Sequence, residues 1–242
     1  MGLSRMRFRI WLTPFLGDRM KEHKIDVCIW DFNGTILDDV DAGIFAVNEL
    51  LSECGISGIP SREAYQESFG FPIRAYYEKI GFDFQKTPYE ELAPRWVEKY
   101  LRYVKKAECF EDVADTVRFL KKQGVRQIVL SATEREMLLG QLESLGLLGE
   151  FEEILGLDNI HAASKLSLAR AWREKNPEAR VLLIGDTDHD VETARAISAE
   201  CVLIARGHQS KQRLEHLGVP ILFTLSEMLD AYFRESPRSS RQ

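Results

Sequence analysis

The chain has 242 residues, of which 45% are hydrophobic and 29% are charged, and its formal net charge is −6 at pH 7. These values are ordinary for a globular protein that buries a sizeable core. The excess of negative charge disfavours a nucleic-acid partner, because phosphate backbones bind to positive surfaces. No run approaches the roughly 20 apolar residues of a membrane-spanning helix. The composition therefore predicts one large domain, or a domain with a smaller second one, and excludes a membrane span.

The two ends of the sequence differ from the rest. Residues 1–24 are basic and partly apolar, but Arg9 and Pro14 interrupt the apolar part and no small-residue cleavage site follows. We expect a loosely attached N-terminal extension there, and the alternative is a helix that lies on a membrane surface. The composition of residues 234–242, "RESPRSSRQ", predicts a disordered tail.

The four cysteines are Cys28, Cys54, Cys109 and Cys201, far apart and without a CxxC pair. Two of them, Cys28 and Cys201, lie inside apolar runs. This placement favours buried free thiols over disulfides or zinc ligands. A reducing, cytoplasmic location fits that pattern best.

Five short apolar runs predict β-strands, at residues 26–30, 126–130, 180–185, 201–205 and 220–223. They are continuous rather than alternating, as in parallel strands that are covered on both faces. Helical patterns separate them, at residues 112–124, 134–146, 164–176, 190–199 and 211–218, and several end at a glycine. This alternation predicts a doubly wound α/β core with a parallel sheet, formed by residues 25–40 and 109–233.

Residues 41–108 interrupt that alternation. Helical patterns occupy 42–55 and 88–106, and no convincing strand lies between them. The segment is too long for an ordinary crossover, so we expect an α-helical cap inserted after the first strand. Because ligands bind at the carboxyl ends of strands in such sheets, the cap would cover the site as a lid. Within it, Arg74 and Lys79 lie beside aromatic residues, and Arg74 could hold a substrate carboxylate. Solvated basic residues on a helix that begins at Pro72 are the preferred interpretation.

Polar residues follow the predicted strands at the points where each strand ends. Asp31 ends the first run, Ser131 the second, and Asp186 and Asp190 follow the third, while Lys165 opens the helix before it. Taken singly, each has a simple explanation as a turn, a helix cap or a surface residue. Converging carboxylates, however, repel each other unless a cation is present, and oxygen ligands suit Mg²⁺. A lysine and a hydroxyl supply the charge and donors that a phosphoryl group needs, and a carboxylate can be a nucleophile.

Four motifs carry a resemblance to a known family. They are "DFNGTILD" (31–38), Ser131, Lys165 in "ASKLSLA", and "GDTDHD" (185–190). In this order and spacing they resemble those of the haloacid dehalogenase (HAD) superfamily of hydrolases, in its helical-cap branch, closest in pattern to phosphoglycolate phosphatases. The resemblance spans residues 25–232, and the family's first motif resembles D-x-D-G-T-L-x-D.

The resemblance implies a role for each matching residue. Asp31 would attack phosphorus and form an aspartyl-phosphate, which implies hydrolysis of a small phosphate monoester with phosphoglycolate as the first candidate. Mg²⁺ would be held by Asp31, Asp186 and the backbone carbonyl of Asn33, with Asp190 in support. The implied phosphate-binding residues are Gly34, Thr35, Ser131, Ala132 and Lys165.

Asn33 departs from the family pattern. The resemblance implies an aspartate there that protonates the leaving oxygen and then activates water, and such help is worth about 10²–10⁴ in rate. Several alternatives stay open: leaving groups that need no proton, such as acyl phosphates; a different reaction of the superfamily; or a weak enzyme that binds and senses a phosphorylated metabolite. Deamidation at Asn33-Gly34 would also restore the aspartate. Another residue could substitute for the acid, and the candidates are Asp38, Asp39, Asp188 and His189. The oligomeric state, monomer or homodimer, is not predicted.

Overall fold

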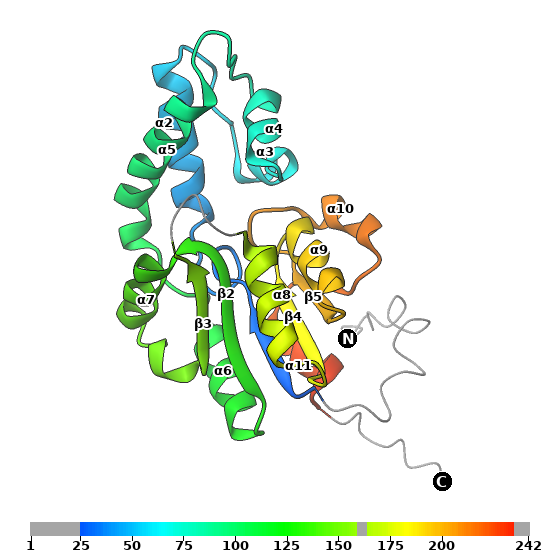
Figure 1. Cartoon of the computed structure of the whole chain (residues 1–242). Helices are drawn as coiled ribbons and strands as arrows, with labels where there is room; N and C mark the ends of the chain where they lie inside the picture. The colour runs from blue at the N-terminus through cyan, green and yellow to red at the C-terminus, as the bar shows by residue number, and fades with distance from the viewer. Residues whose placement is uncertain (1–24, 159–163, 235–242) are drawn as a thin grey trace, which may run out of the picture.

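The computed structural model describes residues 25–158 and 164–234, so the expected extension at 1–24 and residues 235–242 of the expected tail lie outside the described part. A six-stranded, all-parallel sheet forms the centre, in the order β3-β2-β1-β4-β5-β6. Helices cover both of its faces (Figure 1). The strands are β1 (Val27–Trp30), β2 (Arg126–Glu134), β3 (Glu153–Leu157), β4 (Val181–Gly185), β5 (Glu200–Ile204) and β6 (Ile221–Leu222). The doubly wound α/β core is thus confirmed.

The strand β3 is the one that the apolar runs did not predict. It lies at the edge of the sheet and pairs only with β2 among the described strands. Its sequence, "EILGL", buries only Gly156 fully. An edge strand that is half covered needs no continuous apolar run, so hydrophobicity alone gave no signal for it.

Successive residues of the central strands point to opposite faces of the sheet. Cys28 and Trp30 pack with α6 (Val113–Lys122), α7 (Arg135–Ser144) and α11 (Leu225–Tyr232). Val27 and Ile29 pack on the other face with α8 (Lys165–Lys175), α9 (Asp188–Ala196) and α10 (Lys211–Leu214). Both faces are buried, which is why these strands read as continuous apolar runs.

The cap consists of α2 (Val40–Glu53), α3 (Arg62–Ser68), α4 (Ile73–Lys79) and α5 (Tyr89–Tyr103). The helices α2 and α5 lie side by side and rise from the core, with α3 and α4 across from them (Figure 1). Residues 41–108 contain no strand, so the helical cap is confirmed, while its end points at 41 and 108 remain predictions. Arg74 is half exposed and pairs with Glu90, as expected of a solvated residue.

The cap rests on the loop that follows β5. The Gln66 side chain donates to the Gly207 carbonyl (2.7 Å), and Arg62 donates to the Arg206 carbonyl (3.2 Å). Because the carboxyl ends of parallel strands lie at one edge of the sheet, the contact with the loop after β5 places the cap over the carboxyl ends of β1, β4 and β5. Three short 3₁₀ turns, at Val104–Lys106, Leu148–Glu150 and Glu215–Leu217, complete the described helices.

Two bulk expectations can be compared with the structure. In the described residues, no helix is long and apolar enough to cross a membrane. All four cysteines are free thiols, and Cys28 and Cys201 are buried. The predicted absence of disulfides within the chain is therefore confirmed.

Candidate active site

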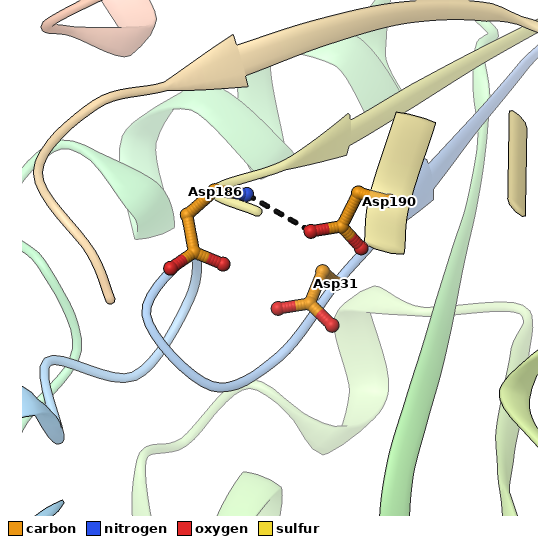
Figure 2. Close-up of side chains that lie close together, drawn as sticks. All are labelled: Asp31, Asp186 and Asp190. Carbon is orange, nitrogen blue, oxygen red and sulfur yellow. Dashed lines mark hydrogen bonds between the residues drawn. The ribbon is translucent and has the colours of Figure 1, made fainter. Parts of the chain in front are cut away.

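Neighbouring strands bring three of the predicted carboxylates together. Trp30 of β1 is in register with Ile184 of β4, so the residues that follow these strands emerge side by side. Asp31 follows β1, Asp186 follows β4, and Asp190 lies in the first turn of α9. One oxygen of each lies within 4.8 Å of one oxygen of the other two. Figure 2 shows the three side chains pointing toward one another.

Lys165 joins these three residues, and we name the four the carboxylate cluster. It is the first residue of α8, whose N-cap Ser164 accepts a hydrogen bond from the backbone N–H of Ser167 (3.2 Å). The Lys165 ammonium donates to Asp31 and to Asp190 (2.5 Å for the latter). Lys165 is only 5% exposed, so its interpretation as a surface lysine is wrong.

Burial governs the protonation of this cluster. It raises the pKa of Asp31 to about 7, although the Lys165 charge opposes the rise. It also raises the pKa of Asp186 well above its usual range. At Asp190 burial acts in the same direction, but the Lys165 ammonium prevails and lowers the pKa of that carboxyl. One ammonium therefore does not compensate three buried carboxylates, and the oxygen donors fit an added hard cation such as Mg²⁺.

Asp190 has a structural role as well. Its Oδ2 accepts the backbone N–H of Asp186 (3.1 Å, dashed in Figure 2) and that of Thr187 (3.0 Å). The Thr187 hydroxyl donates to the same oxygen (2.8 Å). These bonds begin α9 and fix the chain at Asp186. Asp190 thus combines the helix-start role with a place in the cluster.

The loop after Asp31 packs tightly against Asp186. Gly34 has φ +74°, and a Cβ there would overlap the side chains of Asp186 and His208. The Thr35 hydroxyl donates to Asp186 Oδ1 (3.4 Å). The His208 backbone N–H donates to Asp186 Oδ2 (2.5 Å). Gly34 and Thr35 therefore shape the loop around Asp186, and their implied phosphate-binding role stays a prediction.

Asn33 lies in a second polar group, which we name the asparagine cluster: Asn33, Asp39, Tyr100, Thr133 and His208. Asn33 Nδ2 donates to Asp39 Oδ2 (2.9 Å) and to Tyr100 Oη (2.8 Å). Asn33 Oδ1 accepts from the Thr133 hydroxyl (2.9 Å). The Tyr100 hydroxyl in turn donates to Asp39 Oδ2 (2.6 Å). Every polar atom of the Asn33 side chain is engaged.

Asp39 and His208 form an ion pair inside this cluster. Asp39 Oδ1 accepts the Gly34 backbone N–H (2.8 Å) and faces His208 Nε2 (3.2 Å). Burial would lower the pKa of His208, but the Asp39 carboxylate prevails and raises it to about 9. Burial would raise the pKa of Asp39, but His208 and its other donors lower it. The other ring nitrogen of His208 lies 3.0 Å from the hydroxyl of Tyr65, a residue of the cap.

Ser131 connects β2 to the asparagine cluster. Its hydroxyl donates to the Thr133 hydroxyl (3.0 Å) and accepts the Thr133 backbone N–H (3.0 Å). Neither Ser131 nor Thr133 caps α7, because Glu134 accepts the first N–H groups of that helix. Ala132 lies between them and is exposed, and the phosphate-binding roles of Ser131 and Ala132 stay predictions.

Of the four candidate substitutes for the missing acid, Asp39 is the one with a described bond to Asn33. Asp38 pairs with Arg62 of the cap (3.2 Å), and Asp188 accepts from Gln209 (2.9 Å). The His189 ring contacts Glu192 (3.4 Å) and the ring of Phe71. Sequence reasoning missed His208 and Tyr100. His208 follows the apolar run of β5, and the same pattern of a polar residue after an apolar run identified Asp31. Tyr100 lies on a cap helix, where no such pattern marks it.

Comparison with known proteins places this site in a family. A model described as haloacid dehalogenase-like hydrolase matches residues 28–204. The chain therefore belongs to the haloacid dehalogenase-like hydrolase family, and it is an enzyme of the hydrolase class.

Three of the proteins to which this chain is similar are also named as phosphatases or haloacid dehalogenase-like hydrolases. The chain is 27% identical over 195 residues to a phosphoglycolate phosphatase of Pseudomonas savastanoi pv. phaseolicola, covering 74% of this chain and 69% of that one. It is 26% identical to a phosphoglycolate phosphatase of Aquifex aeolicus, covering 75% and 85%. A haloacid dehalogenase-like family hydrolase of Streptococcus pneumoniae shares the fold, with a TM-score of 0.70 at 18% identity, covering 87% and 99%.

Proposed function

We propose that this protein is a Mg²⁺-dependent phosphatase of small phosphate esters. The observation that carries the proposal is the Asp31 carboxylate, which is buried, paired with Lys165, and adjacent to Asp186 and Asp190. Asp31 attacks phosphorus, and Lys165 holds its carboxylate in place and compensates the charge of the phosphoryl oxygens. Phosphoglycolate is the first candidate substrate, because both relatives described above carry the name phosphoglycolate phosphatase.

The proposed metal site uses the chain's own oxygen atoms. Asp31, Asp186 and the backbone carbonyl of Asn33 would hold Mg²⁺, and Asp190 would support the site. When bound, Mg²⁺ supplies positive charge to the phosphoryl oxygens. Ser131 and Lys165 donate to those oxygens, and the cap excludes water by resting on the loop after β5. Free thiols support a cytoplasmic location as part of the proposal.

A second candidate function is binding or sensing of a phosphorylated metabolite with little turnover. It is favoured by Asn33, because an amide gives no useful proton and both hydrogens of this amide are engaged. The carboxylate cluster would bind a phosphate group and Mg²⁺ equally well in such a protein.

Phosphate release separates the two functions. The assay compares wild type with Asp31→Asn across a panel of phosphorylated metabolites, with Mg²⁺ or with EDTA. A phosphatase shows turnover that needs Mg²⁺ and is lost in Asp31→Asn. Saturable ligand binding by calorimetry without turnover would instead favour the sensor.

A further inference from the structure

We infer that the site prefers phosphoric anhydrides, such as acyl phosphates, over alkyl phosphate esters, because the asparagine cluster leaves no side chain to protonate the leaving oxygen. The inference rests on the proposed phosphatase function, and within it replaces phosphoglycolate, an alkyl ester, by a phosphoric anhydride as the expected substrate class. It depends on which acceptor each hydrogen-bond donor near Asn33 contacts within the described residues.

The Asn33 amide has no hydrogen to give. Its two N–H groups donate to Asp39 Oδ2 (2.9 Å) and to Tyr100 Oη (2.8 Å). The side-chain amide of Asn33 cannot flip by about 180°, because its Oδ1 atom would then face the Asp39 carboxylate. The Thr133 hydroxyl donates to Oδ1 (2.9 Å) and holds the same orientation.

The neighbouring hydroxyls are committed in the same way. Tyr100 donates to Asp39 (2.6 Å), and Thr133 donates to Asn33 (2.9 Å). His208 has both ring nitrogens occupied, one by Asp39 (3.2 Å) and one by the Tyr65 hydroxyl (3.0 Å). Each of these donors therefore already has a protein partner.

Asp39 does not serve as the missing acid either. Its two oxygens accept from Asn33 Nδ2, the Gly34 N–H, the Tyr100 hydroxyl and His208 Nε2. A carboxylate has about four lone-pair sites, so these donors fill it and leave no place for a proton. Asp39 is a positioning residue that acts through Asn33.

The leaving group decides whether this matters. When Asp31 attacks an alkyl phosphate, the P–O bond breaks toward an alkoxide, which needs a proton. When it attacks an acyl phosphate, the electron pair leaves with a carboxylate, which needs none. Water then attacks the phosphorus of the aspartyl-phosphate, its two protons leave with dihydrogen phosphate, and the Asp31 carboxylate is restored. Positioned acid help is worth about 10²–10⁴ in rate, and only the alkyl ester requires it.

The chain offers a matched variant, the exchange Asn33→Asp/Asp39→Asn. It keeps the shape and the total charge of the pair and moves the carboxyl group to residue 33. The amide introduced at residue 39 then donates toward residue 33, as Asn33 now donates toward Asp39. The single variant Asn33→Asp places two carboxylates in contact and serves as the unfavourable comparison.

The experiment measures kcat/KM with Mg²⁺ for acetyl phosphate and for phosphoglycolate, with Asp31→Asn as the blank. We expect wild type to favour acetyl phosphate, and the exchange variant to lower that preference by about 10²–10⁴-fold. If the exchange variant does not fold, wild type is tested on aryl phosphates, where kcat/KM should fall as the leaving oxygen becomes more basic.

The outcomes separate this inference from the proposed function. Equal turnover of both substrates, or no fall across the aryl phosphates, with Asp31→Asn inactive, overturns the inference and leaves the phosphatase intact. Turnover of neither class, or turnover that persists in Asp31→Asn, overturns both.

Discussion

The two polar clusters at the end of β1 differ in how their charges are balanced. The carboxylate cluster holds three carboxylates and the Lys165 ammonium, and burial raises the pKa of both Asp31 and Asp186. The asparagine cluster holds one carboxylate, Asp39, against His208, and its hydrogen-bonding atoms face partners. The first cluster lacks positive charge, whereas the second is complete within the protein.

This difference indicates where ligands act. A buried cluster with excess negative charge is stabilised by whatever supplies positive charge, so it is suited to bind a cation. A cluster whose donors and acceptors are all matched gains nothing from a ligand and instead fixes the positions of its members. Asn33 therefore belongs to the fixed part of the site, although it lies only two residues from Asp31.

The largest expected effect is the loss of the one cation in the carboxylate cluster. Lys165→Met leaves Asp31 and Asp190 buried without their partner, and breaking a buried ion pair in this way costs about 3–5 kcal/mol. Urea unfolding in EDTA measures it, with the exposed Lys122→Met as the control. If Lys165→Met lowers the free energy of unfolding by less than about 1 kcal/mol, the Lys165 ammonium does not balance the buried carboxylates as described.

The second prediction concerns Mg²⁺. At about 100 times its Kd, Mg²⁺ should stabilise wild type by about 2.7 kcal/mol, which raises Tm by about 5–10 °C. Asp186→Asn should lose most of that rise, whereas Asp230→Asn, which changes an exposed carboxylate, should keep it. Thermal unfolding with Mg²⁺ and with EDTA measures the rise. Equal rises in the two variants would place Mg²⁺ elsewhere.

A smaller effect is expected in the asparagine cluster. Tyr100→Phe removes the hydroxyl that donates to Asp39 and accepts from Asn33, so stability should fall by about 1–3 kcal/mol. Tyr103→Phe, on the same helix, loses a bond to the partly exposed Glu49 and should cost less. If the two clusters are separate, Mg²⁺ should stabilise Tyr100→Phe as much as wild type, so the stability difference between them should be the same with Mg²⁺ and with EDTA. A difference that changes with Mg²⁺ would mean that the two clusters are not separate.

The smallest effect is a pH dependence between α2 and α5. Hydrogen bonds from Arg102 and Lys99 lower the pKa of Glu49 to about 2. A lowered pKa means that Glu49 contributes stability above its unfolded pKa near 4.5, and that this contribution is lost as pH falls toward 2. Urea midpoints of wild type and Glu49→Gln should therefore differ at pH 6 and converge near pH 2.5. A constant difference would contradict this assignment.

The carboxylate cluster was predictable from the sequence because each member follows an apolar run or opens a helix. Asp31, Asp186 and Lys165 needed only the rule that parallel strands end at one edge of the sheet. Five strands of the doubly wound core followed from the same runs, whereas β3, half covered at the edge of the sheet, has no continuous apolar run.

The asparagine cluster was only partly predictable. Asn33 was evident as a departure from the family pattern, and Asp39 was one of four candidate substitutes. Tyr100 comes from a helix 67 positions away along the chain, and no local pattern indicates which face of that helix meets the loop. Contacts between cap and core depend on how these two parts of the chain pack together, so the sequence alone does not predict them.

The most direct test of the account is to find the phosphoryl group. Wild type and Asp31→Asn are mixed with acetyl phosphate and Mg²⁺, quenched in acid during turnover, and examined by intact mass and peptide mapping. We predict one added phosphoryl group in wild type, on Asp31, and none in Asp31→Asn. Turnover without a phosphorylated protein, or a phosphoryl group on another residue, would contradict the assignment of Asp31 as the nucleophile.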